Sequence, residues 1–532
     1  MGGSLSVGGS VHHLGCDTAA LPGSSFPYYN LSPDCVWNLA TTRGGLAVLV
    51  LSLALILVVR YSTSPWRRVP PGPRGLPLIG NVLELRDKVW LFQSDCKQKY
   101  EDVMYLSALG QPILVLNSLK AASELLDRRA NIYSGRPRMI MAQDIISGGL
   151  LFALLNPVDD YWRRGRRAAH QVLTKAAVRG YHNVLRKEGV LLTSALLANS
   201  GALEKHFQRA TASATMTILY DYPTLETEND KNLKEILAYA ERQSTTSAPG
   251  AYLVELFPWM LHIPERFARW KHEGNRDFNR FNNLFESLFD RVLSALSEGS
   301  GRPSICASLF KGSDHNQLSR QEMAWLAGGL FVAGADTTSI TMRWWALAMI
   351  AHPEVQKRAH IELDTVVGRS RTPTFSDAPN LLYIQAIVKE VLRWRPALPF
   401  SLPHSTTEDD WYNGMFIPKG TLPERFLDAH GEVLPGPAET REEGHSTYGF
   451  GKRACMGKHV ANDALFIYIA TSLWAVTLEP AHDEDGNKVP FDADVFVDGG
   501  MTLKPAPYEC KITPRFGEVV SILAAEEELL KT

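Results

Sequence analysis

Several features that would assign a function class are scarce or absent in this chain. Cysteine occurs 6 times in 532 residues, which is too few and too scattered for a disulfide scaffold. No CxxC pair or Cys/His cluster indicates a zinc site. Lys+Arg number 55 against Asp+Glu 57, a net charge of −2, so nothing suggests bulk binding of nucleic acid. No internal repeat is found.

The composition is that of a globular protein with an ample core. Hydrophobic residues make up 45% of the chain and charged residues 21%, close to the averages for soluble domains. A chain of this length has room for one large catalytic domain or for roughly two to three smaller ones.

An apolar segment near the N-terminus, residues 44–60, is predicted to anchor the chain in a membrane. Its apolar part, GGLAVLVLSLALILVV (residues 44–59), is uncharged and a little short of the roughly 20 residues that span hydrocarbon. Arg43 and Arg60 at its ends can snorkel outward. A buried core helix is the alternative, and so is a cleaved signal peptide, although no basic region precedes the segment. The arginines that follow it place the remaining chain in the cytosol by the positive-inside rule: Arg60, Arg67, Arg68 and Arg74.

Residues 1–43 would then form a lumenal tail. In this tail Asn30-Leu31-Ser32 is a candidate glycosylation site, and Cys16 with Cys35 a candidate disulfide. Residues 61–77 form a proline-rich hinge. Because proline fixes φ and lacks an N–H donor, its stretch PWRRVPPGPRGLP is expected to run extended without joining helix or sheet.

Near the C-terminus, the sequence YGFGKRACMG (residues 448–457) places Cys455 after two glycines and an arginine, just ahead of a long apolar run. Glycines at this spacing allow positive φ and a close approach to a flat or charged group. The N–H groups and dipole at a helix start favour a thiolate, and such a thiolate can be the axial ligand of a haem iron. For an isolated cysteine, a buried residue in a glycine-rich turn would be the alternative.

A second segment is predicted to form a helix of about thirty residues. Ser319 and Glu322 form a capping box at its start, and Pro353 stops it after Ala351. Its middle, AGADTT (residues 333–338), combines poor helix formers, and threonine hydroxyls there can compete for carbonyls of the preceding turn. A helix–helix contact through small residues is the alternative to a functional reason.

These two motifs resemble those of the cytochromes P-450. The family's cysteine loop reads Phe-Gly-x-Gly-x-Arg-x-Cys-x-Gly, and here Tyr448 replaces the Phe while Met456 stands where Pro is common. The family's oxygen-side helix carries Ala/Gly-Gly-x-Asp/Glu-Thr. The resemblance covers about residues 65–515. It implies a mainly α fold with a smaller β region, a single catalytic domain at residues 78–532, tethered by the N-terminal helix.

By this resemblance Cys455 is the axial ligand of haem b, and Arg453 of the same loop helps to bind the cofactor. Gly334 would leave room for dioxygen. Asp336 and Thr337 would organise proton delivery during oxygen activation, since an acid beside a hydroxyl can relay protons through water.

Three further residues are expected to face the haem propionates. The helix starting at the basic run WRRGRR carries Trp162 and Arg166 at the spacing found in the family, and Arg offers a carboxylate a planar fork of donors. A solvated charged face is the alternative for this run. Its remaining arginines are candidates for a docking surface for an acidic electron donor. His404 falls where the family often has a His or Arg facing a propionate.

Glu390 and Arg393 are spaced to pair on one helix face, and with Arg425 they resemble the family's buried, structural charged triad. One departure stands out. In the family a strand, a short helix and a loop separate the Pro-Lys-Gly-Thr turn from the Pro-Glu-Arg-Phe motif, whereas here only Leu422 lies between Thr421 and Pro423. We therefore expect that Arg425 does not easily reach the Glu390–Arg393 pair.

The resemblance implies a haem-thiolate monooxygenase that inserts one oxygen atom from O2 into an apolar small molecule. Its electrons would come from NADPH through the NADPH–cytochrome P-450 reductase. The chain resembles fungal microsomal enzymes of secondary metabolism, with a terpenoid as one candidate substrate, on the endoplasmic reticulum membrane and in contact with lipid. Two alternatives remain: a form impaired by the missing segment, and a haem-thiolate isomerase or dehydratase, against which the Asp336–Thr337 pair argues.

Overall fold

The computed structural model describes residues 43–85, 89–100, 102–227, 229–248, 250–399, 401–425, 440, 443–499 and 501–530. It divides into two units, Met1–Arg68 and Val69–Thr532. The tail with Asn30, Cys16 and Cys35 lies outside the described residues, so the predictions made for it stay predictions.

The first unit contains the apolar helix. Helix α2 (Arg43–Thr63) extends slightly beyond the predicted anchor at both ends, and its apolar side chains are exposed along its length. Within the described residues it is the one candidate membrane span, Leu46–Arg68. The expectation that the hinge stays out of helices was wrong at its start, where Pro65–Arg68 forms the 3-10 helix η1, because proline is tolerated in the first turn of a helix.

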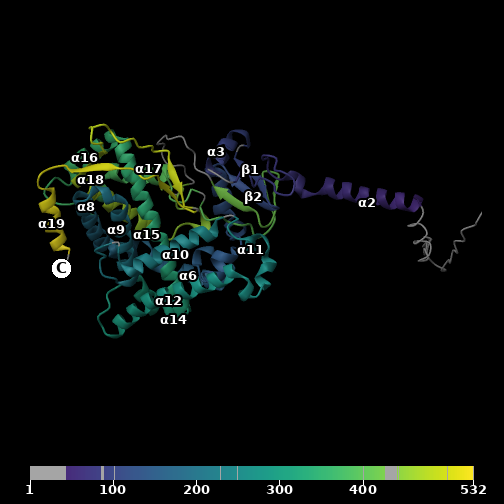
Figure 1. Ribbon diagram of the computed structural model, residues 1–532, viewed down its shortest axis with the longest axis horizontal. Helices are drawn as coiled ribbons and strands as arrows, with labels where there is room; N and C mark the ends of the chain where they lie inside the picture. The colour runs from purple at the N-terminus through teal and green to yellow at the C-terminus, as the bar shows by residue number, and fades with distance from the viewer. Residues whose placement is uncertain are drawn as a thin grey trace, which may run out of the picture. The chain divides into compact units, whose positions relative to one another are not determined.

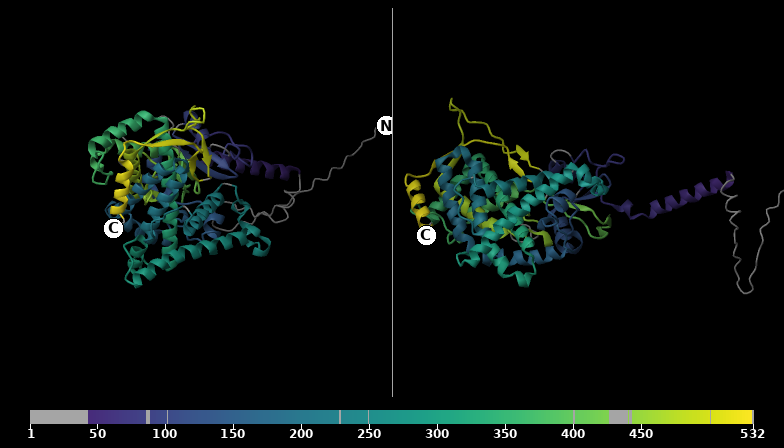
Figure 2. Two further views of the ribbon diagram at one scale, coloured as in Figure 1. Left: turned by 60° about the vertical axis from the view of Figure 1, so that its left-hand side comes forward. Right: turned by 60° about the horizontal axis from the view of Figure 1, so that its bottom comes forward.

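The second unit is mainly helical with small sheets, as the sequence predicted (Figures 1 and 2). Its α-helices in the first half of the unit are α3 (Val89–Tyr100), α4 (Leu119–Ala122), α5 (Ala130–Tyr133), α6 (Asp160–Val172), α7 (Lys175–Val178), α8 (His182–Ala198), α9 (Leu203–Tyr220), α10 (Lys231–Ser247) and α11 (Leu253–Leu256). Those in the second half are α12 (Arg269–Ser297), α13 (Ile305–Lys311), α14 (Ser313–Asn316), α15 (Arg320–Ala351), α16 (Pro353–Val366), α17 (Leu382–Trp394), α18 (Lys458–Ala475) and α19 (Val519–Leu529).

The described strands form one three-stranded sheet and three pairs. They are β1 (Val103–Ala108), β2 (Gln111–Leu116), β3 (Asp410–Tyr412), β4 (Met415–Ile417), β5 (Leu422–Arg425), β6 (Val476–Pro480), β7 (Phe496–Asp498), β8 (Leu503–Pro505) and β9 (Cys510–Pro514). The β1–β2 hairpin turns at Gly110, which has φ of +82°. Strand β5 joins β2 in parallel, whereas β3–β4, β6–β9 and β7–β8 are antiparallel pairs.

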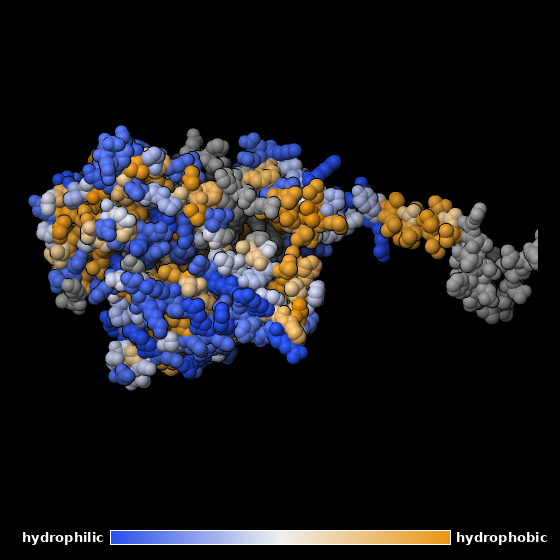
Figure 3. All heavy atoms as spheres, in the orientation of Figure 1, coloured by the Kyte–Doolittle hydropathy of each residue, from blue (hydrophilic) through white to orange (hydrophobic). Residues whose placement is uncertain are grey.

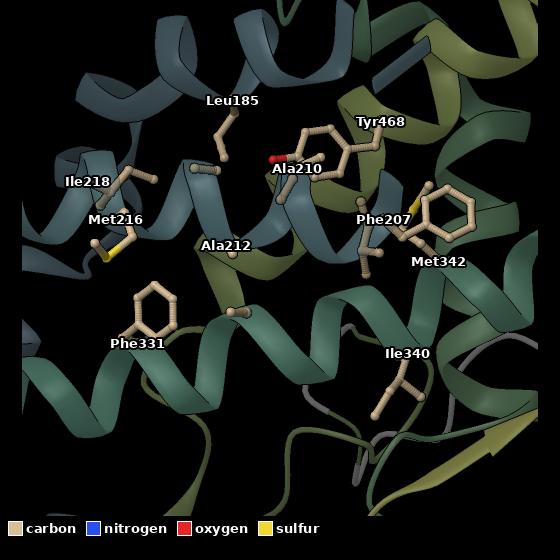
Figure 4. Packing of buried hydrophobic residues seen from close by; sticks show 14 of the residues in the cluster. Leu185, Phe207, Ala210, Ala212, Met216, Ile218, Phe331, Ile340, Met342 and Tyr468 are labelled. Carbon is tan, nitrogen blue, oxygen red and sulfur yellow. The ribbon is translucent and has the colours of Figure 1, made fainter. Parts of the chain in front are cut away.

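The core surrounds α15, which packs against α9, α12 and α18. Figure 4 shows Phe207 and Met216 of α9 next to Phe331 and Met342 of α15, with Tyr468 of α18 close by. All five side chains are fully or almost fully buried. Burial of side chains of this size contributes about 1.5–3 kcal/mol each relative to exposure, so the central helix is held from several sides.

Helix α15 begins and ends where the sequence predicted. The Ser319 side chain accepts a hydrogen bond from the Glu322 N–H, and the Glu322 side chain accepts from the Ser319 N–H, which completes the capping box. The helix ends at Ala351, ahead of Pro353. A long helix with defined ends in the core is the scaffold on which the candidate site is built.

Candidate functional site

The cysteine loop is closed by its own backbone. The Cys455 N–H donates to the Tyr448 carbonyl at 2.8 Å, and the 3-10 helix η11 (Gly451–Arg453) lies between them. Gly449 and Gly451 have φ of +70° and +55°. A Cβ at Gly451 would lie 2.1 Å from the Leu126 carbonyl oxygen, so this position requires glycine both for its dihedral angle and for space.

The Cys455 side chain faces space inside the fold. The residue is exposed, yet burial by the surrounding protein raises the pKa of its thiol above the usual value. Backbone hydrogen bonding from Gly457 and the positive charges of Arg166 and Lys458 act in the opposite direction and lower this pKa. The Cys455 thiol therefore borders a space large enough for solvent, although the surrounding protein desolvates it. This combination places it at an internal hollow rather than on the outer surface.

Four basic side chains gather next to this loop. The Arg453 Nε donates to the Ser134 carbonyl at 2.9 Å, and its guanidinium lies 4.7 Å from the Trp162 ring centroid. Arg166 donates to the Ala454 carbonyl, directly before Cys455, at 2.9 Å. The His404 Nδ1 lies 2.7 Å from the Tyr133 carbonyl oxygen. The structure thus brings together Trp162, Arg166, His404, Arg453 and Cys455, and their role at a haem stays a prediction.

The fourth basic side chain, Arg136, was missed by the sequence reasoning. It is 7% exposed and donates to the Leu402 and Pro403 carbonyls at 2.6 and 2.7 Å. Those partners are more than 260 positions away in the sequence, so no local pattern marks this arginine. Its charge acts on both Arg453 and His404.

The burial of these basic side chains, together with repulsion among the arginines, indicates what the cluster can bind. Burial and the nearby Arg166 lower the pKa of Arg453 to about 10, and burial with the Arg136 charge lowers the pKa of His404 to about 3. Burial and the Arg453 charge lower the pKa of Arg136 well below its usual value. The hydrogen-bond partners named for the three arginines are neutral carbonyls. Buried like charges are costly without counterions, so the cluster fits an anion with more than one carboxylate, such as a haem carrying two propionates.

The middle of α15 opens on one face. Ala333 is exposed, and Gly334, Asp336 and Thr337 are partly exposed, whereas Ala335 and the residues from Thr338 to Ile350 are buried. At 100° per residue, Ala333, Asp336 and Thr337 fall on one face. Space next to a helix that is otherwise buried indicates a hollow in the core at this level.

Within this face Thr337 behaves as its sequence predicts. Its hydroxyl donates to the Ala333 carbonyl at 2.6 Å, the competition with the helix ladder expected for threonine. Burial raises the pKa of Asp336, which Lys504 and Arg343 partly oppose. Gly334 lies at the edge of the face, where an added Cβ would contact the Thr215 side chain of α9 at 3.6 Å.

The charged pair on α17 forms, but it is not buried. Arg393 Nη2 lies 2.6 Å from Glu390 Oε1, and the two side chains are 22% and 44% exposed. This corrects the expectation of a buried pair. The backbone of Arg425 is in β5, opposite Leu116 of β2, and its side chain lies outside the described part of the structure, so its place in the triad stays a prediction.

The basic run on α6 divides between interior and surface. Arg164 pairs with Glu322 at 2.8 Å and with Asp160 at 2.7 Å, so its charge is already neutralised. Arg163 and Arg167 are exposed and remain available for a partner. The sequence did not separate these roles, because they depend on which side of the helix faces α15.

Comparison with known proteins identifies the protein family to which this chain is similar. The family model described as cytochrome P-450 matches residues 70–422 and 422–512, in two parts that meet at Leu422. A cytochrome P-450 monooxygenase of Armillaria gallica is 48% identical over 495 residues, covering 89% of this chain and 95% of the relative. Cytochrome P-450 monooxygenase 58 of Postia placenta is 40% identical over 515 residues, covering 92% of this chain and 98% of the relative.

Proposed function

The chain belongs to the cytochrome P-450 family, a family of haem monooxygenases, and we propose that it inserts one oxygen atom from O2 into a C–H bond or alkene of an apolar small molecule. Its curated relatives are fungal monooxygenases. We further propose a place in fungal secondary metabolism, with a terpenoid as one candidate substrate.

The observation that carries the proposal is the cationic cluster beside an accessible cysteine in the core. Cys455 would be the axial ligand of haem b, with Arg166, Arg453, His404 and Trp162 around its propionates. Arg136 adds a further buried cation to the same cluster. When bound, a haem with a thiolate ligand supplies oxygen activation, because the thiolate pushes electron density toward the iron.

The roles of the chain's own residues follow from the open face of α15. Asp336 and Thr337 lie on this face and would hold and pass protons through water, and Gly334 at its edge would leave room for dioxygen. The partly buried apolar residues Leu330 and Val332 on the same helix support an apolar substrate.

Electrons would come from NADPH through the membrane-bound cytochrome P-450 reductase. The exposed Arg163 and Arg167 on α6 support docking of an acidic protein partner, because exposed charges of one sign attract a complementary surface. The neighbouring Arg164 is held by acidic residues of this chain and would contribute less.

Membrane attachment would place the enzyme on the endoplasmic reticulum, with the catalytic domain in the cytosol and residues 1–43 in the lumen. Helix α2 supports a single-pass anchor. The catalytic unit also carries exposed apolar side chains around α11 and the 3-10 turns that follow it, among them Leu253 at 61%, Trp259 at 64% and Phe267 at 71%. Apolar spheres show on the side of the catalytic unit near α11 in Figure 3. Apolar patches of this kind suit contact with lipid.

A carbon-monoxide difference spectrum of the reduced, membrane-expressed full chain tests the proposal. We expect the red-shifted Soret band of a thiolate-ligated haem, and we expect Cys455→Ala to lose it while Cys510→Ala, which changes a buried cysteine of β9, keeps it. A wild-type chain that binds haem without this band would overturn the assignment of Cys455.

The alternative is a form with impaired haem binding, which would follow from the short link between Thr421 and Pro423. The family match is in two parts that meet at Leu422, where the chain departs from the expected strand, helix and loop and β5 begins. Insertion of the corresponding segment from the Armillaria gallica relative between Thr421 and Leu422 distinguishes the two. A large gain in haem loading would support the impaired form, whereas equal loading would support an active enzyme.

A further inference from the structure

Lys504 brings a positive charge to the open face of α15. Its Nζ lies 3.9 Å from Asp336 Oδ1, and the two side chains are 31% and 25% exposed. In β8 the flanking residues Leu503 and Pro505 are buried while Lys504 is not, as the alternation of a strand requires. The lysine therefore extends from the face of β8 that is opposite to its buried side chains.

Helix α15 itself holds β8 in place. The Trp344 indole N–H donates to the Leu503 carbonyl at 3.1 Å, and Arg343 donates to the Pro505 carbonyl at 3.2 Å. The residues on both sides of Lys504 are thus bound to the helix that carries Asp336. The Leu503 N–H also donates to the Ala397 carbonyl at 2.9 Å. These contacts hold the backbone at Lys504 next to the helix, so the lysine side chain starts within reach of Asp336 without help from the ion pair.

The other charges near Asp336 do not replace Lys504. Arg343, also on α15, is paired with Glu204 of α9 at 2.6 Å, so much of its field is cancelled. Glu204 raises the pKa of Asp336, as does burial, and Lys504 is the strongest influence that lowers it. At 3.9 Å the ammonium is beyond hydrogen-bond distance. It therefore supplies charge without occupying the lone pairs of the carboxylate, which stay available to water.

We propose that Lys504 is a positioning residue for the monooxygenase reaction: its ammonium favours the charged form of the Asp336 carboxylate on the open face of α15, beside Thr337 in the sequence. The inference rests on the proposed function, because only there does Asp336 exchange protons. The alternative is a purely structural role, in which Lys504 clamps β8 to the helix and has no influence on proton transfer.

The test compares Lys504→Met, which keeps the unbranched apolar stem and removes the charged end, with Lys504→Arg, which keeps the charge. Both are made in the haem-loaded full chain. In the resting protein we would follow the infrared band of the protonated Asp336 carboxyl, identified by its loss in Asp336→Asn. An opposite charge this close shifts a carboxyl pKa by roughly one unit or more. The titration midpoint should therefore rise by about one pH unit in Lys504→Met and stay near the wild-type value in Lys504→Arg.

The second readout is NADPH oxidation with reductase, without added substrate, and the peroxide formed per NADPH. In Lys504→Met the acid limb of the pH profile should move to higher pH and the peroxide yield should change, with both restored in Lys504→Arg. An unchanged infrared midpoint overturns the proposal. The proposal is also overturned if the infrared titration midpoint of Asp336 shifts while the pH profile of NADPH oxidation and the peroxide yield stay the same. That result would indicate that Lys504 only clamps β8 to the helix. A carbon-monoxide band and NADPH oxidation in the wild type separate these outcomes from a failure of the proposed function.

Discussion

The glycines of the cysteine loop allow a graded test of how the loop is held. Gly451 combines a positive φ of +55° with a Cβ site 2.1 Å from the Leu126 carbonyl oxygen. Gly449 has a positive φ of +70°, but its Cβ site is 4.0 Å from the nearest atom, the Arg453 carbonyl oxygen. Gly457 has a φ of −84° and nothing within 4 Å. Three alanine substitutions in one loop therefore isolate the dihedral and the steric contributions.

The expected losses of stability follow from these geometries. A left-handed conformation costs an alanine about 1–2 kcal/mol, which is the whole expectation for Gly449→Ala. In Gly451→Ala the backbone clash adds a further cost of about 1–3 kcal/mol, because a carbonyl oxygen of a helix cannot rotate away as a flexible side chain does. Gly457→Ala at a helix N-cap should lose less than about 1 kcal/mol.

The assay is urea unfolding of the detergent-solubilised full chain without haem, followed by haem loading measured from Soret absorbance. Stability should decrease in the order Gly457→Ala, Gly449→Ala, Gly451→Ala, and loading should fall furthest in Gly451→Ala, because moving the loop from Leu126 displaces Cys455. If Gly451→Ala is no less stable than Gly449→Ala, the close approach to Leu126 does not hold the loop, and the reasoning fails.

Two further predictions concern the scaffold. Glu188 is 1% exposed and pairs with Arg209 at 2.8 Å. Glu188→Gln leaves a buried arginine without its counterion, so it should lower the free energy of unfolding by about 3–5 kcal/mol in urea. The control Glu273→Gln, on the surface, should leave the urea midpoint unchanged. Burial lowers the pKa of His360 to about 4, so from pH 6.5 down to about 4 the unfolded chain binds a proton that the folded chain does not, and stability falls by up to about 1.4 kcal/mol per pH unit. His360→Gln should flatten this acid slope and the exposed His315→Gln should not; equal slopes in both variants would contradict the assignment.

Much of the architecture could be predicted from local sequence. Ser319 and Glu322 set the start of α15 because a capping box involves only residues three positions apart. The hydroxyl of Thr337 reaches the carbonyl of its own helix for the same reason. The positive φ angles of the cysteine loop favour glycine at positions 449 and 451, whatever packs around them. These features, together with the apolar run of α2, are short-range, so they are readable in one pass along the chain.

Other features depended on segments that meet only in the folded chain. Arg136 joins the cationic cluster through carbonyls of Leu402 and Pro403, and Lys504 reaches Asp336 because α15 binds both flanks of β8. The exposure of Glu390 could not be predicted either, because the three-residue spacing of Glu390 and Arg393 fits a buried pair and an exposed pair equally well. The sequence by itself determined the apolar helix α2, the ends of α15 and the glycine turns of the cysteine loop. Only the tertiary structure decided which charges share a space, because electrostatic interactions depend on distance and burial rather than on separation along the chain.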